Sequence, residues 1–319
     1  MADNRILFAG TPEISVPLLR ALASRFHVAG VLTSCDKPSG RSSVPVPSPV
    51  KSAALELGLP VIQFDSLRTE AREAVSSLGA DTLVTFAFGR IFGPRFLALF
   101  PKGTFNVHPS ALPMFRGPSP IQAAISAGLK ETAISLQTVG EKMDEGDIWS
   151  CLPVILDGTE NTQTLTTRVS ELAASFVPDV LEDVFAGKKQ PIHQQGEASY
   201  CSMIAKEDGA IDFSRPASEV HSHIRACFPW PKARTSADGK ELMITSVWGT
   251  FSENEGLELL PEGTVPGTVL EYRKDRGLAV ACADRAVWLS GFQLPGKKEM
   301  GHRDFMNGNR WILSAKLGF

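Results

Sequence analysis

Asn106 and His108 stand two positions apart at the end of a short apolar run, residues 104–107. If that run is a β-strand, both side chains project from the same face, because strand side chains alternate. An amide donor beside an imidazole suits a carbonyl oxygen that becomes negative during acyl transfer. The amide can hold the oxygen, and the imidazole can donate to it or move a proton. Taken alone, however, such a pair is more often a structural histidine beside a turn-forming asparagine.

A second polar segment, residues 143–148 (MDEGDI), places acidic side chains around a glycine. A carboxylate at Asp144 near His108 would hold the imidazole charged and could accept a proton through water. Asp144 and Asp147 are also ordinary turn residues. Whether the two segments form one site therefore depends on the fold that positions them.

Apolar runs alternate with helix-like segments through the first 190 residues or so. The predicted strands are residues 6–9, 28–33, 60–64, 82–86 and 104–107. The predicted helices are residues 16–24, 49–57, 66–78, 94–99 and 165–185, the last with Pro178 as a point of bending or interruption. This order predicts an α/β fold, a Rossmann-like, mostly parallel sheet covered by helices. Ligands of such sheets bind beyond the carboxyl ends of the strands, where Asn106 and His108 stand.

The first strand is followed by Gly10-Thr11-Pro12, which lacks the second and third glycines of a dinucleotide-binding loop. Proline at position 12 also removes a backbone donor. A pyrophosphate-binding loop is therefore not expected, and the chain has no Walker-type phosphate loop.

The pattern of the sequence changes after residue 189. Residues 190–205 are polar and without periodicity, which is typical of a linker. Short β-like runs separated by glycine and proline follow at residues 241–247, 267–272, 278–281, 286–289 and 311–313, with a helix predicted at residues 216–226. We therefore predict a catalytic domain over residues 1–189, a linker over 190–205 and a small OB-like β-barrel domain over 206–319.

The 319 residues are 43% hydrophobic and 21% charged, as in a soluble globular protein. No apolar run approaches the ~18 residues of a membrane span, and no signal peptide is evident, so we expect a cytoplasmic protein that does not enter the membrane. The five cysteines form no Cys-x-x-Cys pair and are expected to be reduced. His221 and His223 diverge on a helix without a third ligand, so we expect no metal. Net charge is −3, although residues 271–319 hold nine Lys and Arg against five Asp and Glu, which is typical of an anionic partner or a solvated face.

Residues 105–117 (FNVHPSALPMFRG) and Pro120-Ile121 resemble the folate-dependent formyltransferases, whose pattern is Asn-x-His, a Ser-Leu-Leu-Pro-like stretch, Arg-Gly and Pro-Ile. Residues 143–148 are similar to that superfamily's Asp-x-Gly-Asp turn. Further stretches resemble the methionyl-tRNA formyltransferases within it: residues 8–12, 36–41, 47–51, 206–213, 224–226 and 229–231. The resemblance covers nearly the whole chain and is vaguest over the last ~60 residues.

The resemblance implies transfer of a formyl group from 10-formyltetrahydrofolate to the amine of initiator methionyl-tRNA. It implies that Asn106 and His108 stabilise the oxyanion, while Asp144 orients and charges His108 and helps to deprotonate the amine. The folate-binding residues that it implies are Ser110, Ala111, Leu112 and Pro113, with backbone groups of Phe88, Gly89 and Arg90. The tRNA-binding residues that it implies are Arg41 and Lys37. The loop departs from the family pattern, because Gly40-Arg41 is not followed by the usual glycine and two lysines.

Two alternatives remain. The same chemistry could serve another acceptor: an amino-sugar nucleotide, glycinamide ribonucleotide, or water in a hydrolase. The predicted barrel, the Arg41 loop and the Pro-Trp-Pro segment favour tRNA. A non-catalytic tRNA- or nucleotide-binding protein would keep the barrel but leave Asn106, His108 and Asp144 unexplained. We expect a monomer.

Overall fold

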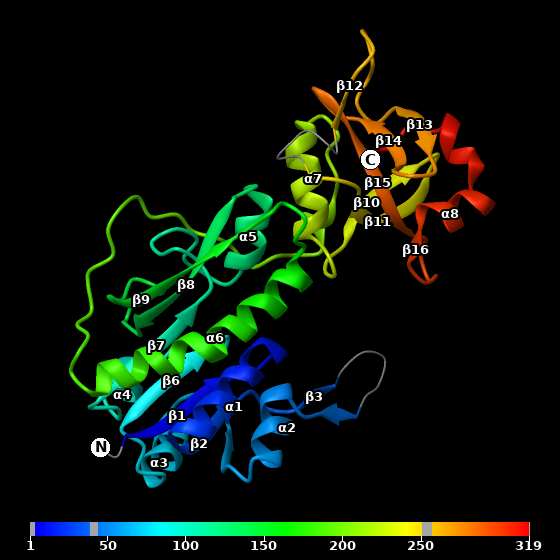
Figure 1. Ribbon diagram of the computed structural model, residues 1–319. Helices are drawn as coiled ribbons and strands as arrows, with labels where there is room; N and C mark the ends of the chain where they lie inside the picture. The colour runs from blue at the N-terminus through cyan, green and yellow to red at the C-terminus, as the bar shows by residue number, and fades with distance from the viewer. Residues whose placement is uncertain (1–3, 39–43, 251–256, 319) are drawn as a thin grey trace. The chain divides into compact units, whose positions relative to one another are not determined.

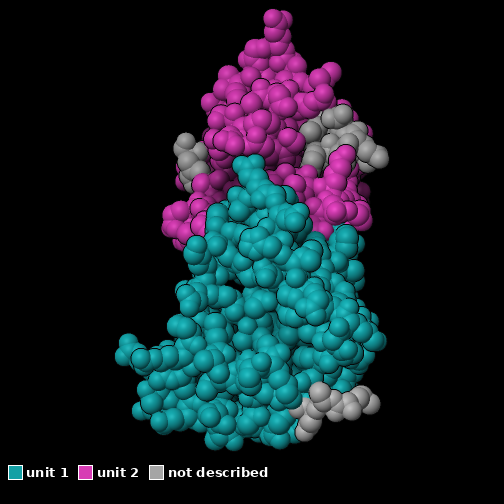
Figure 2. All heavy atoms as spheres, turned by 90° about the vertical axis from the view of Figure 1, so that its left-hand side faces the viewer, with its two compact units in different colours: residues 1–120, 133–154, 166–201 teal, residues 121–132, 155–165, 202–319 magenta. Residues whose placement is uncertain are grey.

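The computed structural model describes residues 4–38, 44–250 and 257–318 (Figure 1). The chain divides into two compact units, coloured separately in Figure 2. The first unit holds Met1–Pro120, Ala133–Val154 and Thr166–Cys201, and the second holds Ile121–Thr132, Ile155–Leu165 and Ser202–Phe319. Within the described ranges, none of the helices combines the length and the apolar character that crossing a bilayer requires.

A seven-stranded sheet forms the centre of the first unit, in the order β5-β2-β1-β6-β7-β8-β9. Its strands are β1 (Arg5–Gly10), β2 (His27–Thr33), β5 (Val61–Gln63), β6 (Thr82–Phe86), β7 (Gly103–His108), β8 (Glu131–Thr138) and β9 (Ile148–Ile155). The first five of these in sheet order pair in parallel, and β8 joins β7 antiparallel. This confirms the predicted mostly parallel sheet. A separate two-stranded hairpin consists of β3 (Lys37–Pro38) and β4 (Pro45–Val46).

Five of the helices that follow these strands lie close to the predicted bounds, whereas η1 and α5 were not predicted. The helices are η1 (Glu13–Ser15), α1 (Val16–Arg25), α2 (Pro49–Glu56), α3 (Thr69–Ser77), α4 (Pro94–Leu97), α5 (Pro120–Ser126) and α6 (Thr162–Phe185). The expected interruption at Pro178 is wrong, since α6 continues through it. Val177 and Leu181 on either side are fully buried, and this packing outweighs the single backbone hydrogen bond that proline removes.

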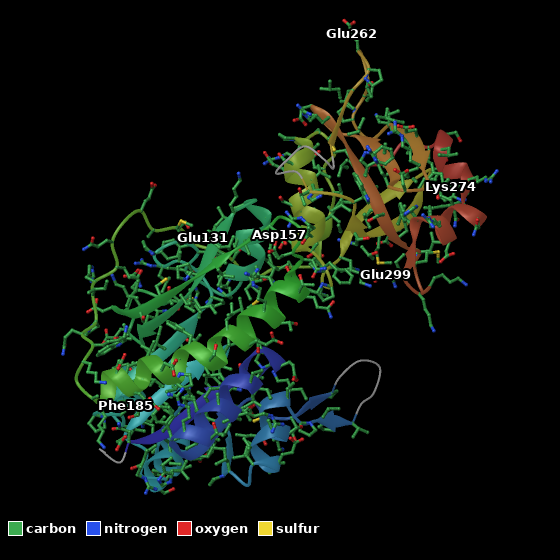
Figure 3. All side chains as sticks on the ribbon, in the orientation of Figure 1. Glu131, Asp157, Phe185, Glu262, Lys274 and Glu299 are labelled. Carbon is green, nitrogen blue, oxygen red and sulfur yellow. The ribbon has the colours of Figure 1, made fainter. Side chains whose placement is uncertain are left out.

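Helices cover both faces of this sheet (Figure 1). On one face α1 and α6 lie together, because Arg25 forms ion pairs with Asp179 and Glu182. Phe185 lies at the end of α6 (Figure 3). Its ring packs edge-on against that of Phe105 in β7, with the ring centroids 6.2 Å apart. Since side chains alternate along a strand, Asn106 and His108 project from the opposite face.

The second unit is built on antiparallel strands in the order β10-β11-β15-β14-β13, with β12 and β16 also pairing with β15. The strands are β10 (Ala233–Ala237), β11 (Lys240–Val247), β12 (Leu257–Leu259), β13 (Val269–Arg273), β14 (Gly277–Ala281), β15 (Arg285–Gln293) and β16 (Met300–Gly301). Bridges from Leu317 to Ala237 and from Lys316 to Thr268 connect the two ends of this order. An antiparallel sheet whose ends are joined in this way is the arrangement of a small barrel.

The helices described beside these strands are η2 (Glu207–Gly209), α7 (Ala217–Ala226), α8 (His302–Gly308) and η3 (Arg310–Ser314). The prediction of a strand at residues 311–313 is wrong, because these residues lie in the 3-10 helix η3. A three-residue apolar run carries no period that separates strand from helix. Ile312, in the middle of η3, is fully buried in the core of this unit.

His221 is buried in α7 with both ring nitrogens engaged. Arg225 Nε donates to Nδ1 at 3.2 Å, so the ring proton is on Nε2, which donates to the carbonyl of Gly249 at 3.0 Å. Burial, followed by the charge of Arg225, lowers the pKa of His221 from 6.5 to about 4. Neither nitrogen is left to bind a metal in this neutral tautomer.

We expect the free energy of unfolding to fall as the pH drops from 6.5 to 4, because the native state binds fewer protons than the unfolded chain in that window. The loss from His221 is on the order of 3 kcal/mol, at about 1.4 kcal/mol per pH unit. Urea unfolding followed by tryptophan fluorescence at several pH values measures it. His221→Gln keeps a donor for Gly249 and does not titrate, so its curve should be flatter. An equally steep curve in the variant would assign the effect to other groups.

Candidate active site

The candidate catalytic residues lie where β7 pairs with β8. In this register Asn106 stands opposite Gln137, and His108 stands opposite Ser135. All four side chains therefore share one face of the sheet. The parallel strands β1, β2, β6 and β7 end at the same edge, so the loops that follow them gather around this position.

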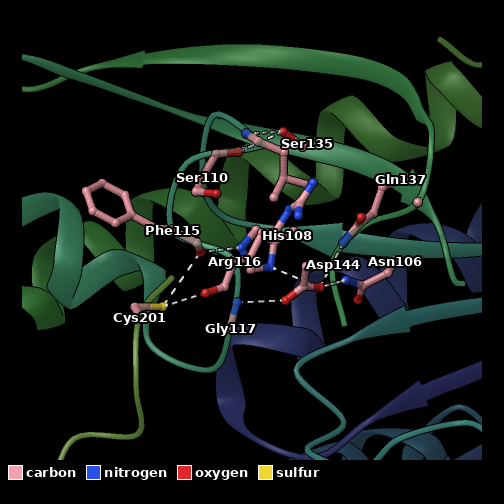
Figure 4. A network of polar contacts seen from close by, with 12 residues as sticks. Asn106, His108, Ser110, Phe115, Arg116, Gly117, Ser135, Gln137, Asp144 and Cys201 are labelled. Carbon is pink, nitrogen blue, oxygen red and sulfur yellow. Dashed lines mark hydrogen bonds and ion pairs between the residues drawn. The ribbon is translucent and has the colours of Figure 1, made fainter. Parts of the chain in front are cut away.

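Asp144 comes to this face from the loop between β8 and β9 (Figure 4). Its backbone is in the left-handed region, with φ of +55°. Oδ1 accepts hydrogen bonds from Gln137 Nε2 at 2.8 Å and from Asn106 Nδ2 at 3.3 Å, while Oδ2 accepts one from the backbone N–H of Gly117 at 2.9 Å. Donors thus surround both oxygens, as expected for an ionised carboxylate held in one orientation.

The imidazole of His108 is almost fully buried beside this carboxylate. Nε2 donates to the carbonyl of Phe115 at 2.9 Å, and Nδ1 lies 3.6 Å from Asp144 Oδ1. Burial lowers the pKa of His108, and the nearby charge of Asp144 opposes this effect. A neutral ring whose unprotonated Nδ1 faces a carboxylate can take up a proton and keep it between the two groups.

The loop after β7 is shaped by its own hydrogen bonds. The Ser110 hydroxyl is fully buried and donates to the carbonyl of Met114 at 2.5 Å. Leu112 and Pro113 are also buried, and the peptide bond between them is cis. Ala111 is partly exposed. Of the four residues predicted for folate, only Ala111 therefore has a side chain at the surface of the loop.

The second predicted folate segment follows β6 at the same edge of the sheet. The Phe88 side chain is buried and stacks on Phe92, with ring centroids 5.3 Å apart. Gly89 is exposed, has φ of +79° and has no atom within 4 Å of the place a Cβ would occupy. The guanidinium of Arg90 donates to the carbonyl of Phe64. Exposed backbone is thus what this segment presents to a ligand.

Of the two residues predicted to bind tRNA, Lys37 belongs to the β3–β4 hairpin. Lys37 is exposed in β3. The prediction for Arg41 lies outside the described residues. Beside the hairpin, Asp36 pairs with Lys51 at 2.6 Å.

Several residues that join the network were not predicted. Gln137 contacts Asp144 directly, and Gln194 reaches the same turn from the segment predicted as a linker. Arg116 binds Gln194 and forms an ion pair with Glu145. Only Arg116 had a sequence signal, as the arginine of the Arg-Gly motif. The glutamines stand in segments without a recognisable pattern.

Comparisons with known proteins agree with this geometry. Residues 4–181 match the family model Formyl transferase, and residues 203–310 match Formyl transferase, C-terminal domain. A methionyl-tRNA formyltransferase of Treponema pallidum (strain Nichols) is 42% identical, over 98% of this chain and 99% of the relative. The methionyl-tRNA formyltransferase of Bacillus subtilis (strain 168) is 38% identical, over 99% of this chain and 98% of the relative.

Solved structures share the fold at lower identity. WlaRD, a sugar 3N-formyl transferase, aligns with a TM-score of 0.66 at 17% identity, over 93% of this chain and 100% of that one. A methionyl-tRNA formyltransferase from Clostridium thermocellum aligns with a TM-score of 0.56 at 18% identity, over 78% and 95%. The sequence similarity to methionyl-tRNA formyltransferases extends over nearly the full length of the chain. The structure agrees with it in the α/β sheet, the antiparallel C-terminal unit and the grouping of Asn106, His108 and Asp144. The chain therefore belongs to the methionyl-tRNA formyltransferase family.

Proposed function

We propose that this protein transfers the formyl group of 10-formyltetrahydrofolate to the α-amino group of initiator methionyl-tRNA. The observation that carries the proposal is the convergence of Asn106, His108, Gln137 and the Gly117 N–H on the carboxylate of Asp144. The similarity to a methionyl-tRNA formyltransferase over 98% of the chain supports the tRNA as acceptor.

The folate supplies an activated formyl carbonyl, and its oxygen becomes negative when the amine attacks. One N–H of the Asn106 amide is bonded to Asp144, and we assign the second to that oxygen. His108 and Asp144 act as one proton acceptor for the attacking amine, since Nδ1 and Oδ1 lie 3.6 Å apart and can hold a proton between them. His108 then returns this proton to the departing nitrogen of the folate.

Binding of the two substrates is assigned to the loops at the carboxyl edge of the sheet. The folate lies against Ala111 and the backbone of Phe88, Gly89 and Arg90, with Ser110, Leu112 and Pro113 shaping the loop from inside. Lys37 and Arg41 contact the tRNA, and residues 206–319 form the platform that binds it. Two structural neighbours support a folate, since one was solved with tetrahydrofolic acid and WlaRD with 5-N-formyl-THF.

A formylation assay tests this function. The purified chain is incubated with 10-formyltetrahydrofolate and methionine-charged initiator tRNA, and in parallel with an amino-sugar nucleotide, with glycinamide ribonucleotide, or with no acceptor. We expect rapid formylation of the tRNA alone. If a small amine were formylated faster than the tRNA, that amine would be the acceptor and the proposal would be wrong. Hydrolysis of the formyl folate without an acceptor would identify a hydrolase.

Replacing Arg41 by alanine should raise the KM for tRNA several-fold and leave the KM for the folate unchanged. The reason is that a Lys or Arg contact to a phosphate contributes to the affinity for nucleic acid. Its loss should also lower the slope of log affinity against log salt concentration by about one unit. Steady-state kinetics at two salt concentrations measure both effects. Arg72→Ala, on the surface of α3, is the matched control. Equal tRNA kinetics in the two variants would remove Arg41 from the interface.

A further inference from the structure

The segment between the two family-model matches lies against the candidate active site. Residues 194–201, here called the strap, run beside the loop that follows β7. The Ser199 N–H donates to the carbonyl of Pro113 at 3.2 Å, and the Arg116 N–H donates to the carbonyl of Ser199 at 2.9 Å. The Cys201 N–H donates to the carbonyl of Arg116 at 2.8 Å. These bonds fix the strap against the loop that follows β7, within the first unit.

Gln194, at the start of the strap, is 8% exposed and points into the network. Its Nε2 donates to the carbonyl of Asp144 and to the carbonyl of Gly146, both at 2.8 Å. An amide nitrogen carries two hydrogens, so these two short bonds use both of them, and Gln137 Oε1 lies farther away, at 3.4 Å. Gln194 therefore binds the backbone on either side of Glu145, within the turn that carries the candidate catalytic carboxylate.

Arg116 holds the other end of the same amide. Its Nε and Nη2 donate to Gln194 Oε1 at 3.1 and 2.7 Å. Because both lone pairs of this oxygen face guanidinium hydrogens, the amide has one orientation, with its nitrogen toward the turn. The same guanidinium donates to the Tyr200 hydroxyl at 2.9 Å and pairs with Glu145 at 3.3 Å.

The turn that Gln194 holds is a costly one. Asp144 has φ of +55°, in the left-handed region that is uncommon for residues other than glycine, although aspartate adopts it more often than most. Gly146 lies so close to β8 that a Cβ would stand 1.8 Å from the carbonyl of Thr138. The two bonds from Gln194 hold the backbone of this turn, in addition to the bonds that its carboxylate accepts.

From this arrangement we infer that Gln194 is a positioning residue for the formyl transfer, acting through the Asp144 backbone. Gln194 touches the turn and not the reacting atoms. Its contribution is to keep the carboxylate in place beside His108 and Asn106. The inference rests on the proposed function, because the reaction it serves is the formylation described above.

Two substitutions separate positioning from a role in holding the strap. Gln194→Met keeps the length of the side chain and removes every hydrogen bond. Gln194→Glu keeps an oxygen for Arg116 but cannot donate to the carbonyls of Asp144 and Gly146. Gln195, the next residue, is exposed, and Gln195→Ala is the matched control. We expect kcat to fall about 10- to 100-fold in both Gln194 variants, with KM for folate within twofold of wild type, since a displacement near 1 Å costs this much.

Two further measurements distinguish the outcomes. Thermal unfolding should place both variants within a few degrees of wild type. Histidine NMR titration, with the His108 signal assigned by its loss in His108→Ala, should show a lower His108 pKa in Gln194→Met than in wild type, because the carboxylate that opposes the effect of burial has moved away. Wild-type kcat in Gln194→Glu, or an unchanged His108 titration in Gln194→Met, would overturn the inference. Failure of the proposed function is seen separately, as absent tRNA formylation by the wild-type protein.

Discussion

Replacing Asp144 by asparagine is expected to lower kcat by about 10³-fold, within the range for loss of a positioned acid–base group. The substitution removes the charge that His108 Nδ1 faces at 3.6 Å. It also places an NH₂ group opposite other donors, whichever way the amide turns. One orientation faces Gln137 and Asn106, and the other faces the Gly117 N–H. The amide therefore cannot restore the network that the carboxylate accepts.

The control lies in the same loop. The Asp147 side chain pairs with His193 at 3.0 Å. Asp147→Asn should keep kcat near that of wild type. Single-turnover formylation of charged initiator tRNA measures the chemical step in both variants, and folate binding is followed separately by fluorescence. A rate for Asp144→Asn within tenfold of Asp147→Asn would contradict the proposed mechanism.

The second large effect is expected at Gly117, which should not accept even a methyl group. Its φ is +116°, and a Cβ would lie 2.3 Å from the carbonyl oxygen of Cys201. Alanine would push the loop and the strap apart and draw the Gly117 N–H away from Asp144 Oδ2. We expect Gly117→Ala to lower kcat by about 10²-fold or more, since the carboxylate loses a charge-assisted hydrogen bond as well as its position.

Substitution of Gly196 is the control that separates the effect of a steric clash from that of backbone strain. It has φ of +101° but no atom within 4 Å of the place a Cβ would occupy, so alanine there meets only the conformational cost of about 1–3 kcal/mol. Thermal unfolding and kcat of Gly196→Ala and Gly117→Ala are compared directly. Equal kcat values in the two variants would show that the contact between Gly117 and Cys201 has no bearing on catalysis.

The extent to which sequence predicts this site differs between its members. Asn106 and His108 follow from the alternation of side chains along a strand, and that strand has a clear apolar pattern. Asp144 could be joined to them only through the family motif, because residues 131–138 were not predicted as a strand. Without β8, no register exists in which Gln137 stands opposite Asn106.

Gln194 marks the limit of local reasoning. It stands among polar residues without periodicity, the composition of a linker, and its partner carbonyl at Asp144 is 50 positions away in the chain. The sequence does not distinguish a buried glutamine from an exposed one here: Gln194 is buried and its neighbour Gln195 is exposed. Burial of Gln194 depends on the pairing of the strap with residues 113–116, and Phe115 and Ser199, which bond to each other there, are 84 positions apart.

The strap also bears on where the polypeptide can be cut without losing the catalytic apparatus. A fragment that ends at residue 189 would lack Gln194, and Arg116 and the carbonyls of Asp144 and Gly146 would lose its amide. A fragment that runs through Cys201 keeps these bonds and ends where the first compact unit ends. A catalytic fragment should therefore include the strap, and a hybrid enzyme in which the residues after Cys201 are exchanged should be joined there.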